Sequence, residues 1–310
     1  MNTETLLLVE KCSHAFSFYN LETGQREHSV ALPDFPHEFV VDSQSRYAYV
    51  GHYGLENSGL PGPGGHKVFQ IDLQQRILVR EIDLRPFNRL HGMHMDAQDR
   101  LYVLSEEKAT LLVLPQPQTD NAPARAVSSG GLKSHLFALS RDGETAYCMN
   151  LLSHTVTQVR PWDPLHVPVA CHPGLKPEGY ALSADEKTLI VTNRISNTLG
   201  AIDTATMQLR FSMPAREDPT RIYLHRDGHR MLVTNYGEAS ISIVDAATLK
   251  ELGHVPTGSR PIALSYHPRQ ELAYVSLDDD RVGVFNLTTY TFDRYLKTQR
   301  EPDVSKVVSL

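Results

Sequence analysis

The sequence predicts an all-β protein, a seven-bladed β-propeller whose blades are four-stranded antiparallel sheets. One observation is that an apolar strand recurs seven times, beginning at residues 36, 90, 134, 177, 219, 261 and 302, with steps of 54, 44, 43, 42, 42 and 41 residues. A second is that short strands and polar turns fill each interval. A period of about 40 to 45 residues is typical of a propeller blade, which buries its faces only against neighbouring blades.

The order of strands within one unit is clearest in the middle of the chain. The segments "LIVTN" and "MLVTN" end at Asn193 and Asn235. Each is preceded by a strand that begins with proline and then by a polar turn. A third strand closing on "AIDTAT" or "IVDAAT" comes next. The strand that opens each unit is predicted to be the innermost of its blade. In chain order these strands read PHEFVVD, LHGMHMD, SHLFALS, PEGYALS, PTRIYLH, RPIALSYH and PDVSKVV.

The two ends of the chain are predicted to share one blade. The segments "TLLLVEK", "AFSFYNLETG" and "REHSVALP" have the pattern of the last three strands of a blade that lacks its innermost strand. The missing strand is present as "PDVSKVVSL" at residues 302–310. Joining the termini in one sheet hides the edges that an open array would expose. We therefore expect a single propeller domain over residues 1–310.

Composition excludes several classes of protein. The chain has 41% hydrophobic and 21% charged residues, as an ordinary globular protein has. Its net charge is -6 and it contains no basic block, so nucleic acid is not expected as a partner. The opening "MNTETLLLVEKC" is too short in apolar residues for a signal peptide or a membrane span. Three cysteines form no paired framework and suit a reducing compartment, so a cytoplasmic location is expected.

Four segments carry a family resemblance. They are "SRDGETAYCMN", "SADEKTLIVTN", "HRDGHRMLVTNYGEASISIVD" and "HPRQELAYVSLDDDRVGVFN". Each resembles the YVTN repeat, in which a turn of Asp-Gly type leads to a Tyr-Val-Thr-Asn strand and then to an Ile-Asp strand. The resemblance implies a seven-bladed propeller of the lactonase-like superfamily. That superfamily includes lactonases, lactonizing enzymes and haem-binding modules, so the resemblance alone fixes no single activity.

One column of the repeat carries a chemical pattern. Innermost strands line the channel of a propeller, so equivalent positions form a ring. The second residues of the seven strands are His37, His91, His135, Glu178, Thr220, Ile262 and Asp303. Imidazole and carboxylate are ligands of divalent metals such as Mn, Fe, Ni or Zn. The sequence therefore predicts a metal site formed by His37, His91, His135 and Glu178, with the identity of the ion left open. The alternative is a solvated ring with a structural role.

A second group of side chains is predicted near the mouth of the channel. Arginine guanidinium groups bind carboxylates and phosphates with two hydrogen bonds. The lactonase and lactonizing enzymes that the fold resembles use His, Glu and Arg in such a cleft for acid–base chemistry. The predicted catalytic residues are Glu178, His135, Arg194 and Arg221. The predicted substrate-binding residues are His52, Tyr53, Arg260 and Tyr236.

Two function classes follow from this pattern. The first is a small-molecule enzyme at the channel mouth, a lactonase-like hydrolase or lyase acting on a small anionic, carboxylate-bearing or sugar-derived substrate. The second is a non-catalytic propeller that binds a protein partner through its rim. The asymmetry of the polar column favours the enzyme. No dinucleotide fingerprint or phosphate loop occurs, so no nucleotide cofactor is expected.

Overall fold

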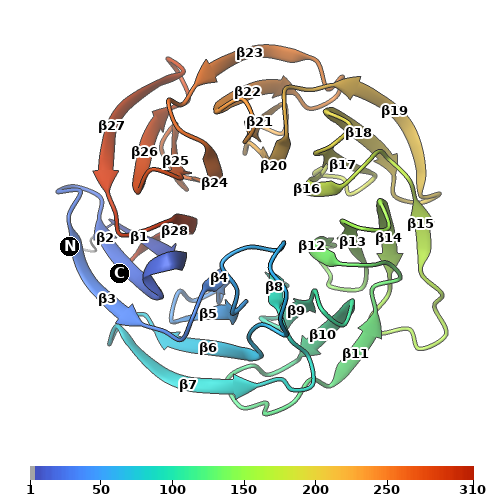
Figure 1. Ribbon diagram of the computed structural model, residues 1–310, viewed down its shortest axis with the longest axis horizontal. Coiled ribbons are helices and arrows are strands. Elements are labelled where there is room, and N and C mark those ends of the chain that lie inside the picture. The colour runs from blue at the N-terminus through green and yellow to red at the C-terminus, as the bar shows by residue number, and fades with distance from the viewer. Residues whose placement is uncertain (1–3) are drawn as a thin grey trace. The chain divides into compact units, whose positions relative to one another are not determined.

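The computed structural model describes residues 4–310 and confirms the predicted fold class (Figure 1). The strands form seven four-stranded sheets, the blades of a seven-bladed β-propeller. Three of these sheets follow one another along the chain: β4 (Pro36–Val41), β5 (Tyr47–His52), β6 (Lys67–Asp72), β7 (Ile77–Asp83); β8 (Leu90–Met95), β9 (Leu101–Ser105), β10 (Thr110–Leu114), β11 (Arg125–Ser128); and β12 (Ser134–Leu139), β13 (Ala146–Asn150), β14 (Thr155–Val159), β15 (Val169–Cys171).

Three further sheets repeat the same order of strands. They are β16 (Pro177–Leu182), β17 (Thr188–Asn193), β18 (Thr198–Asp203), β19 (Gln208–Pro214); β20 (Pro219–Leu224), β21 (Arg230–Asn235), β22 (Ser240–Asp245), β23 (Glu251–Pro256); and β24 (Pro261–Tyr266), β25 (Leu272–Leu277), β26 (Arg281–Asn286), β27 (Thr291–Lys297). In all six of these sheets the strand that opens with the recurring apolar segment lies at one edge, as the repeat predicts.

The remaining sheet joins the two ends of the described chain. Its order is β28 (Pro302–Ser309), β1 (Glu4–Glu10), β2 (Ala15–Asn20) and β3 (Arg26–Ala31), and a short 3-10 helix, η1 (Lys11–Ser13), separates β1 from β2. Strand β28 runs antiparallel to β1, with Leu6 opposite Val307 and Leu8 opposite Ser305. The C-terminal strand therefore completes the N-terminal blade, and Figure 1 shows the red β28 beside the blue β1.

The chain divides into two compact units, which are described separately. The first unit comprises Met1–Glu107, Val113–Ala124 and Ile262–Leu310, and the second comprises Lys108–Leu112 and Arg125–Pro261. The single domain expected over residues 1–310 stays a prediction. Within residues 4–310, no helix has the length and apolar character needed to cross a membrane.

Apolar side chains from adjacent sheets form the core of each unit. In the first unit Phe16 packs edge-on against Phe18 and Phe39, with ring centroids 5.5 and 5.1 Å apart. In the second unit Met149 lies in one cluster with Leu189 and Val191 of the next sheet. Burying each such side chain contributes roughly 1.5–3 kcal/mol. The middle strands are therefore apolar on both faces, which is why they have continuous hydrophobic runs.

A β-bulge recurs at the start of the strands predicted to be innermost. In β12, for example, Ser134 pairs with Asn150 while Leu136 pairs with Met149, so His135 is an extra residue in its strand. Equivalent register shifts occur in β4, β8, β16 and β20. A bulge breaks the strict alternation of side chains and turns consecutive residues toward the same side. This local feature determines which side chains meet at the candidate site.

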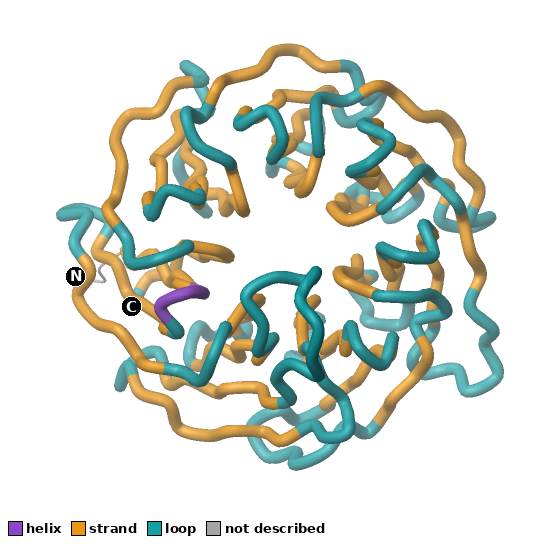
Figure 2. The backbone as a smooth tube through the Cα atoms, in the orientation of Figure 1, coloured by secondary structure: helices purple, strands orange, loops and turns teal. Residues whose placement is uncertain are grey.

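A long loop connects β5 to β6 in the first unit (Figure 2). It covers residues 53–66 and contains several glycines and prolines. The Arg89 guanidinium donates hydrogen bonds to the carbonyl oxygens of Gly62, at 2.7 Å, and Leu60, at 2.9 Å. The loop is therefore attached to the residue that directly precedes β8.

Candidate functional site

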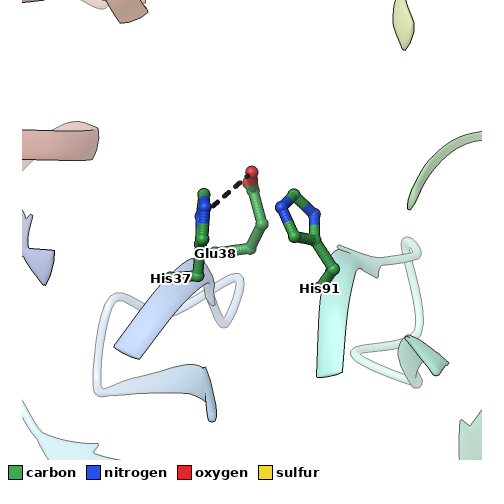
Figure 3. A group of neighbouring side chains, drawn as sticks. All are labelled: His37, Glu38 and His91. Atoms are coloured by element: carbon green, nitrogen blue, oxygen red, sulfur yellow. Dashed lines mark ion pairs between the residues drawn. The ribbon is translucent and has the colours of Figure 1, made fainter. Parts of the chain in front are cut away.

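Two histidines from neighbouring sheets of the first unit lie in contact. His37 and His91 are the second residues of β4 and β8, and both sit in the bulges of these strands. Their ring centroids are 4.2 Å apart, with an angle of 48° between the ring planes. The whole His91 residue is inaccessible to solvent. The sequence placed both in one column, and the structure brings them together (Figure 3).

A third residue of the predicted column supports this pair. Asp303 is the second residue of β28 and is fully buried. Its Oδ2 atom lies 3.2 Å from Nδ1 of His37. A carboxylate at one ring nitrogen fixes the orientation and tautomer of an imidazole and raises its basicity.

Glu38 joins the cluster, although the sequence analysis did not select it. Its Oε1 atom lies 3.9 Å from Nδ1 of His37, and one potential ligand atom from each of His37, Glu38 and His91 lies within 4.8 Å of the other two (Figure 3). Strict alternation along β4 would point residues 37 and 38 in opposite directions. The bulge removes that alternation, so both side chains reach the same place. Glu38 is the only carboxylate at the third position of these strands, a signal that the sequence contained.

Tyr53 packs against both histidines. Its ring centroid lies 5.5 Å from that of His37 and 5.2 Å from that of His91. The Tyr53 hydroxyl donates a hydrogen bond of 2.8 Å to Oε1 of Glu106, and burial together with this carboxylate raises the pKa of the tyrosine. The tyrosine was predicted to bind substrate, and the structure places it 1% exposed behind the histidines. Its geometry suits holding the two rings in position.

His52 points to a different environment. Its ring centroid lies 5.4 Å from that of Phe69 and 6.3 Å from that of His66. Burial, followed by the nearby His66, lowers the pKa of His52, so its neutral form is favoured. The structure gives this predicted substrate-binding residue contacts with the core of its own sheet.

Ionic groups surround the cluster and connect it to the loop of residues 53–66. Arg89 donates to Oε1 of Glu106 at 3.3 Å as well as to the loop carbonyls. Lys11 forms an ion pair with Glu301 and interacts electrostatically with Asp303. Burial alone would lower the pKa of Lys11, but these two carboxylates raise it above its usual value. The sequence analysis missed Arg89 and Lys11, because their partners come from distant segments.

The second unit contains a separate ionic cluster around Glu178. Nη1 of Arg194 donates a hydrogen bond of 2.8 Å to Oε2 of Glu178. Two further hydrogen bonds, of 2.5 and 2.7 Å, join the same guanidinium to Asp218. Arg194 was predicted to be catalytic, and the structure shows its guanidinium hydrogen-bonded to two carboxylates of the protein.

The charge state of Glu178 follows from this environment. Burial would raise the pKa of its carboxyl group, but the positive charges of Arg194, His135 and Arg221 and the hydrogen bond from Arg194 lower it to about 2. The side chain is therefore ionised at neutral pH. It cannot donate a proton there, and a carboxylate with so low a pKa is a weak base. The structure places His135, the neighbour of Glu178 in the predicted column, and Arg221 in the electrostatic environment of Glu178.

Two more predicted residues meet in the second unit. The guanidinium carbon of Arg260 lies 5.1 Å from the ring centroid of Tyr236, and that of Arg194 lies 6.0 Å from the same centroid. Such cation–π contacts help to hold an arginine in place. The second unit thus gathers Glu178, His135, Arg194, Arg221, Arg260 and Tyr236. Convergence of this group with His37 and His91 on one metal stays a prediction.

The fold and the histidine cluster define a seven-bladed β-propeller with a buried imidazole and carboxylate centre. Residues 170–269 match a family model described as a YNCE-like beta-propeller. The predicted resemblance to YVTN-repeat, lactonase-like propellers is confirmed as a resemblance of fold. No curated protein sequence matches the chain.

Three solved structures illustrate this likeness. A functionally unknown protein from Desulfotomaculum acetoxidans is 13% identical with a TM-score of 0.80, and the match covers 98% of this chain and 99% of that one. Proteins from Bacteroides uniformis and Bacteroides fragilis, each provisionally named a 6-phosphogluconolactonase, are 15% and 16% identical with TM-scores of 0.76 and 0.78. These matches cover 99% of this chain in both cases, and 100% and 98% of the respective relatives. At such identities the likeness is one of fold.

Proposed function

We propose that this chain is a cytoplasmic small-molecule enzyme, a lactonase-like hydrolase or lyase. The proposed substrate is a small anion that carries a carboxylate or derives from a sugar. The observation that carries the proposal is the contact between His37 and His91 in two adjacent bulges, with Asp303 behind the first ring. Imidazoles act at neutral pH as acids, bases or metal ligands, and burial on a rigid sheet keeps their geometry fixed.

The chemistry proposed for this centre is the activation of water. In lactone hydrolysis the water oxygen bonds to the carbonyl carbon, the ring C–O bond breaks, and a proton ends on the released hydroxyl. A group that removes the proton from water and returns it to the leaving oxygen accelerates both parts of this reaction. The proposal keeps the expectation that no nucleotide cofactor takes part. The two provisionally named relatives support lactones as the first substrates to test.

The test is an assay of gluconolactone and 6-phosphogluconolactone hydrolysis, in which the release of acid is measured. We expect His37→Ala and His91→Ala each to lower kcat by about 100-fold or more, because each removes one half of the reactive pair. His172→Ala is the matched control, since this histidine is exposed. Melting temperatures of all variants are measured alongside. Hydrolysis no faster than in buffer, or full activity in both histidine variants, would overturn the proposal.

A second candidate function rests on two pairs of exposed apolar side chains in the second unit. Leu132, Leu152, Leu175 and Ile195 are 63%, 64%, 47% and 59% exposed. The backbone N–H of Leu152 donates to the carbonyl of Leu132, and that of Ile195 donates to the carbonyl of Leu175, so each pair lies on adjoining loops. Exposed apolar groups gathered in this way mark interaction surfaces. The predicted alternative, binding of a protein partner, is therefore also a proposal.

A lysine beside each pair of exposed apolar residues indicates that such a partner carries negative charge. Lys133 and Lys176 directly follow Leu132 and Leu175 in the sequence. The partner that fits is an apolar segment bearing acidic residues. Selection from a peptide library on the native protein should enrich Leu or Phe beside Asp or Glu, and Leu152→Asp with Ile195→Asp should abolish binding of the selected peptides without changing the melting temperature. Enrichment without acidic residues, or unchanged binding to the double variant, would exclude this candidate.

A further inference from the structure

We infer that His37, Glu38 and His91 form a binding site for one divalent transition-metal ion. The three side chains come from two adjacent strands, β4 and β8, and offer ligand atoms that lie within 4.8 Å of one another. Two imidazoles and one carboxylate form a donor set used by zinc, iron, manganese and cobalt. The ligand set differs from the one predicted from sequence, since Glu38 takes the place of His135 and Glu178.

The bulge of β4 makes this donor set possible. It allows consecutive residues, His37 and Glu38, to reach one point, while the ladder resumes with Phe39 opposite Val50. Ligands on paired strands are held more firmly than ligands on loops. The geometry therefore needs no rearrangement of the sheets before an ion binds.

The surroundings of the histidines resemble the supporting shell of a metal centre. Oδ2 of Asp303 lies 3.2 Å from Nδ1 of His37, so a carboxylate stands beside one nitrogen of this ring, as carboxylates do beside metal-binding imidazoles. The ring of Tyr53 packs edge-on against both histidines, and Glu106 holds its hydroxyl. These contacts restrict the rotation of both ligand rings.

Charge and burial are consistent with a cation at this place. Glu38 is 8% exposed and Asp303 is fully buried, so two carboxylates lie close to the imidazole pair. The buried Lys11 interacts electrostatically with Asp303 and is already paired with Glu301. In the second unit, by contrast, Arg194 and the other cations around Glu178 already hold that carboxylate ionised. Of the predicted metal ligands, those of the first unit therefore lie in the electrostatic environment that favours a bound cation more strongly.

This inference deepens the proposed function. Three protein ligands leave at least one coordination position open, and an ion with an open position lowers the pKa of bound water. The site therefore supplies a reason for water activation beside His37 and His91. The ligand set can nevertheless be tested without any substrate.

The experiment measures metal binding directly. The protein is treated with EDTA, dialysed, and titrated with Zn²⁺ by calorimetry and with Co²⁺ by visible absorption, which reports bound histidine and carboxylate ligands. We expect one ion per chain. Glu38→Gln and His91→Ala should weaken binding by at least 100-fold, and Asp303→Asn should weaken it about 10- to 100-fold, as loss of a supporting carboxylate does.

Matched variants separate this ligand set from others. Glu178→Gln and His135→Ala should keep the affinity, and so should His66→Gln, which removes a histidine of the same unit that lies outside the cluster. Circular dichroism confirms that each variant is folded. Absence of binding to the native protein, or loss of binding in Glu178→Gln but not in Glu38→Gln, would overturn the inference. Binding with these ligands but without lactone turnover contradicts only the proposed function, whereas turnover by metal-free protein that binds no ion contradicts only the metal site.

Discussion

Removal of residues 302–310 is expected to abolish cooperative unfolding. Strand β28 pairs with β1 along most of its length, and its loss would expose the N–H and C=O groups of the apolar strand β1. Val307 and Val308 are 7% and 5% exposed and belong to the two cores on either face of this sheet. Burial of each valine contributes roughly 1.5–3 kcal/mol, so the loss is a large part of the stability of an ordinary domain.

Calorimetry and circular dichroism check this expectation. The truncated protein should aggregate or melt without a sharp transition, and a synthetic peptide of residues 302–310 added during refolding should restore the transition. Deletion of Leu310 alone is the control, because this residue lies beyond β28. A truncated protein that melts as sharply as the full chain would show that β28 does not stabilise the first blade.

Replacement of Arg194 by leucine should destabilise the protein by about 3–5 kcal/mol, as breaking a buried ion pair does. The substitution leaves the buried carboxylate of Glu178 without its main partner and deprives Asp218 of two hydrogen bonds. Arg210→Leu is the matched control, since Arg210 pairs with Asp203 at the surface of the same unit, with its side chain 44% exposed. A surface pair of this kind is worth less than about 1 kcal/mol.

The dependence on pH has a definite sign. In the native protein the pKa of Glu178 falls from 4.5 to about 2, so its contribution to stability is complete above pH 4.5 and is lost as the pH drops toward 2. Without Arg194, burial raises this pKa, and protonation then relieves the uncompensated charge. The deficit of the Arg194→Leu variant should therefore shrink between pH 7 and pH 4 in urea melts. Adding Glu178→Gln should recover part of it at pH 7, and a deficit independent of both changes would contradict the assignment.

The sequence predicted the fold in detail because one physical constraint is repeated seven times. Every repeat must bury equivalent apolar strands, so the spacing of segments such as "LIVTN" and "MLVTN" defines the blades. The pairing of β28 with β1 could be predicted for the same reason. The N-terminal blade lacks its innermost strand, and the C-terminal end of the chain supplies one.

The candidate site was predictable only in part. The column of second residues correctly placed His37 beside His91, because equivalent positions in adjacent repeats are neighbours in space. It missed Glu38, because strict alternation of side chains along a strand does not allow for the extra residue of a bulge. It also could not reveal that Arg194 is held by Asp218, since this pair joins loops 24 residues apart whose geometry the repeat does not specify.

The recurring bulge has a further consequence for how propellers of this kind diversify. The extra residue stands outside the regular ladder, and pairing resumes after it, as between Phe39 and Val50. Substitutions at the bulge therefore change the chemistry displayed by a sheet and leave its apolar face and register intact. The bulges of different blades display different residues, as His37 and Glu38 in β4 and Thr220 in β20 illustrate. This separation along one strand lets the displayed residues change while the architecture of the blade is kept.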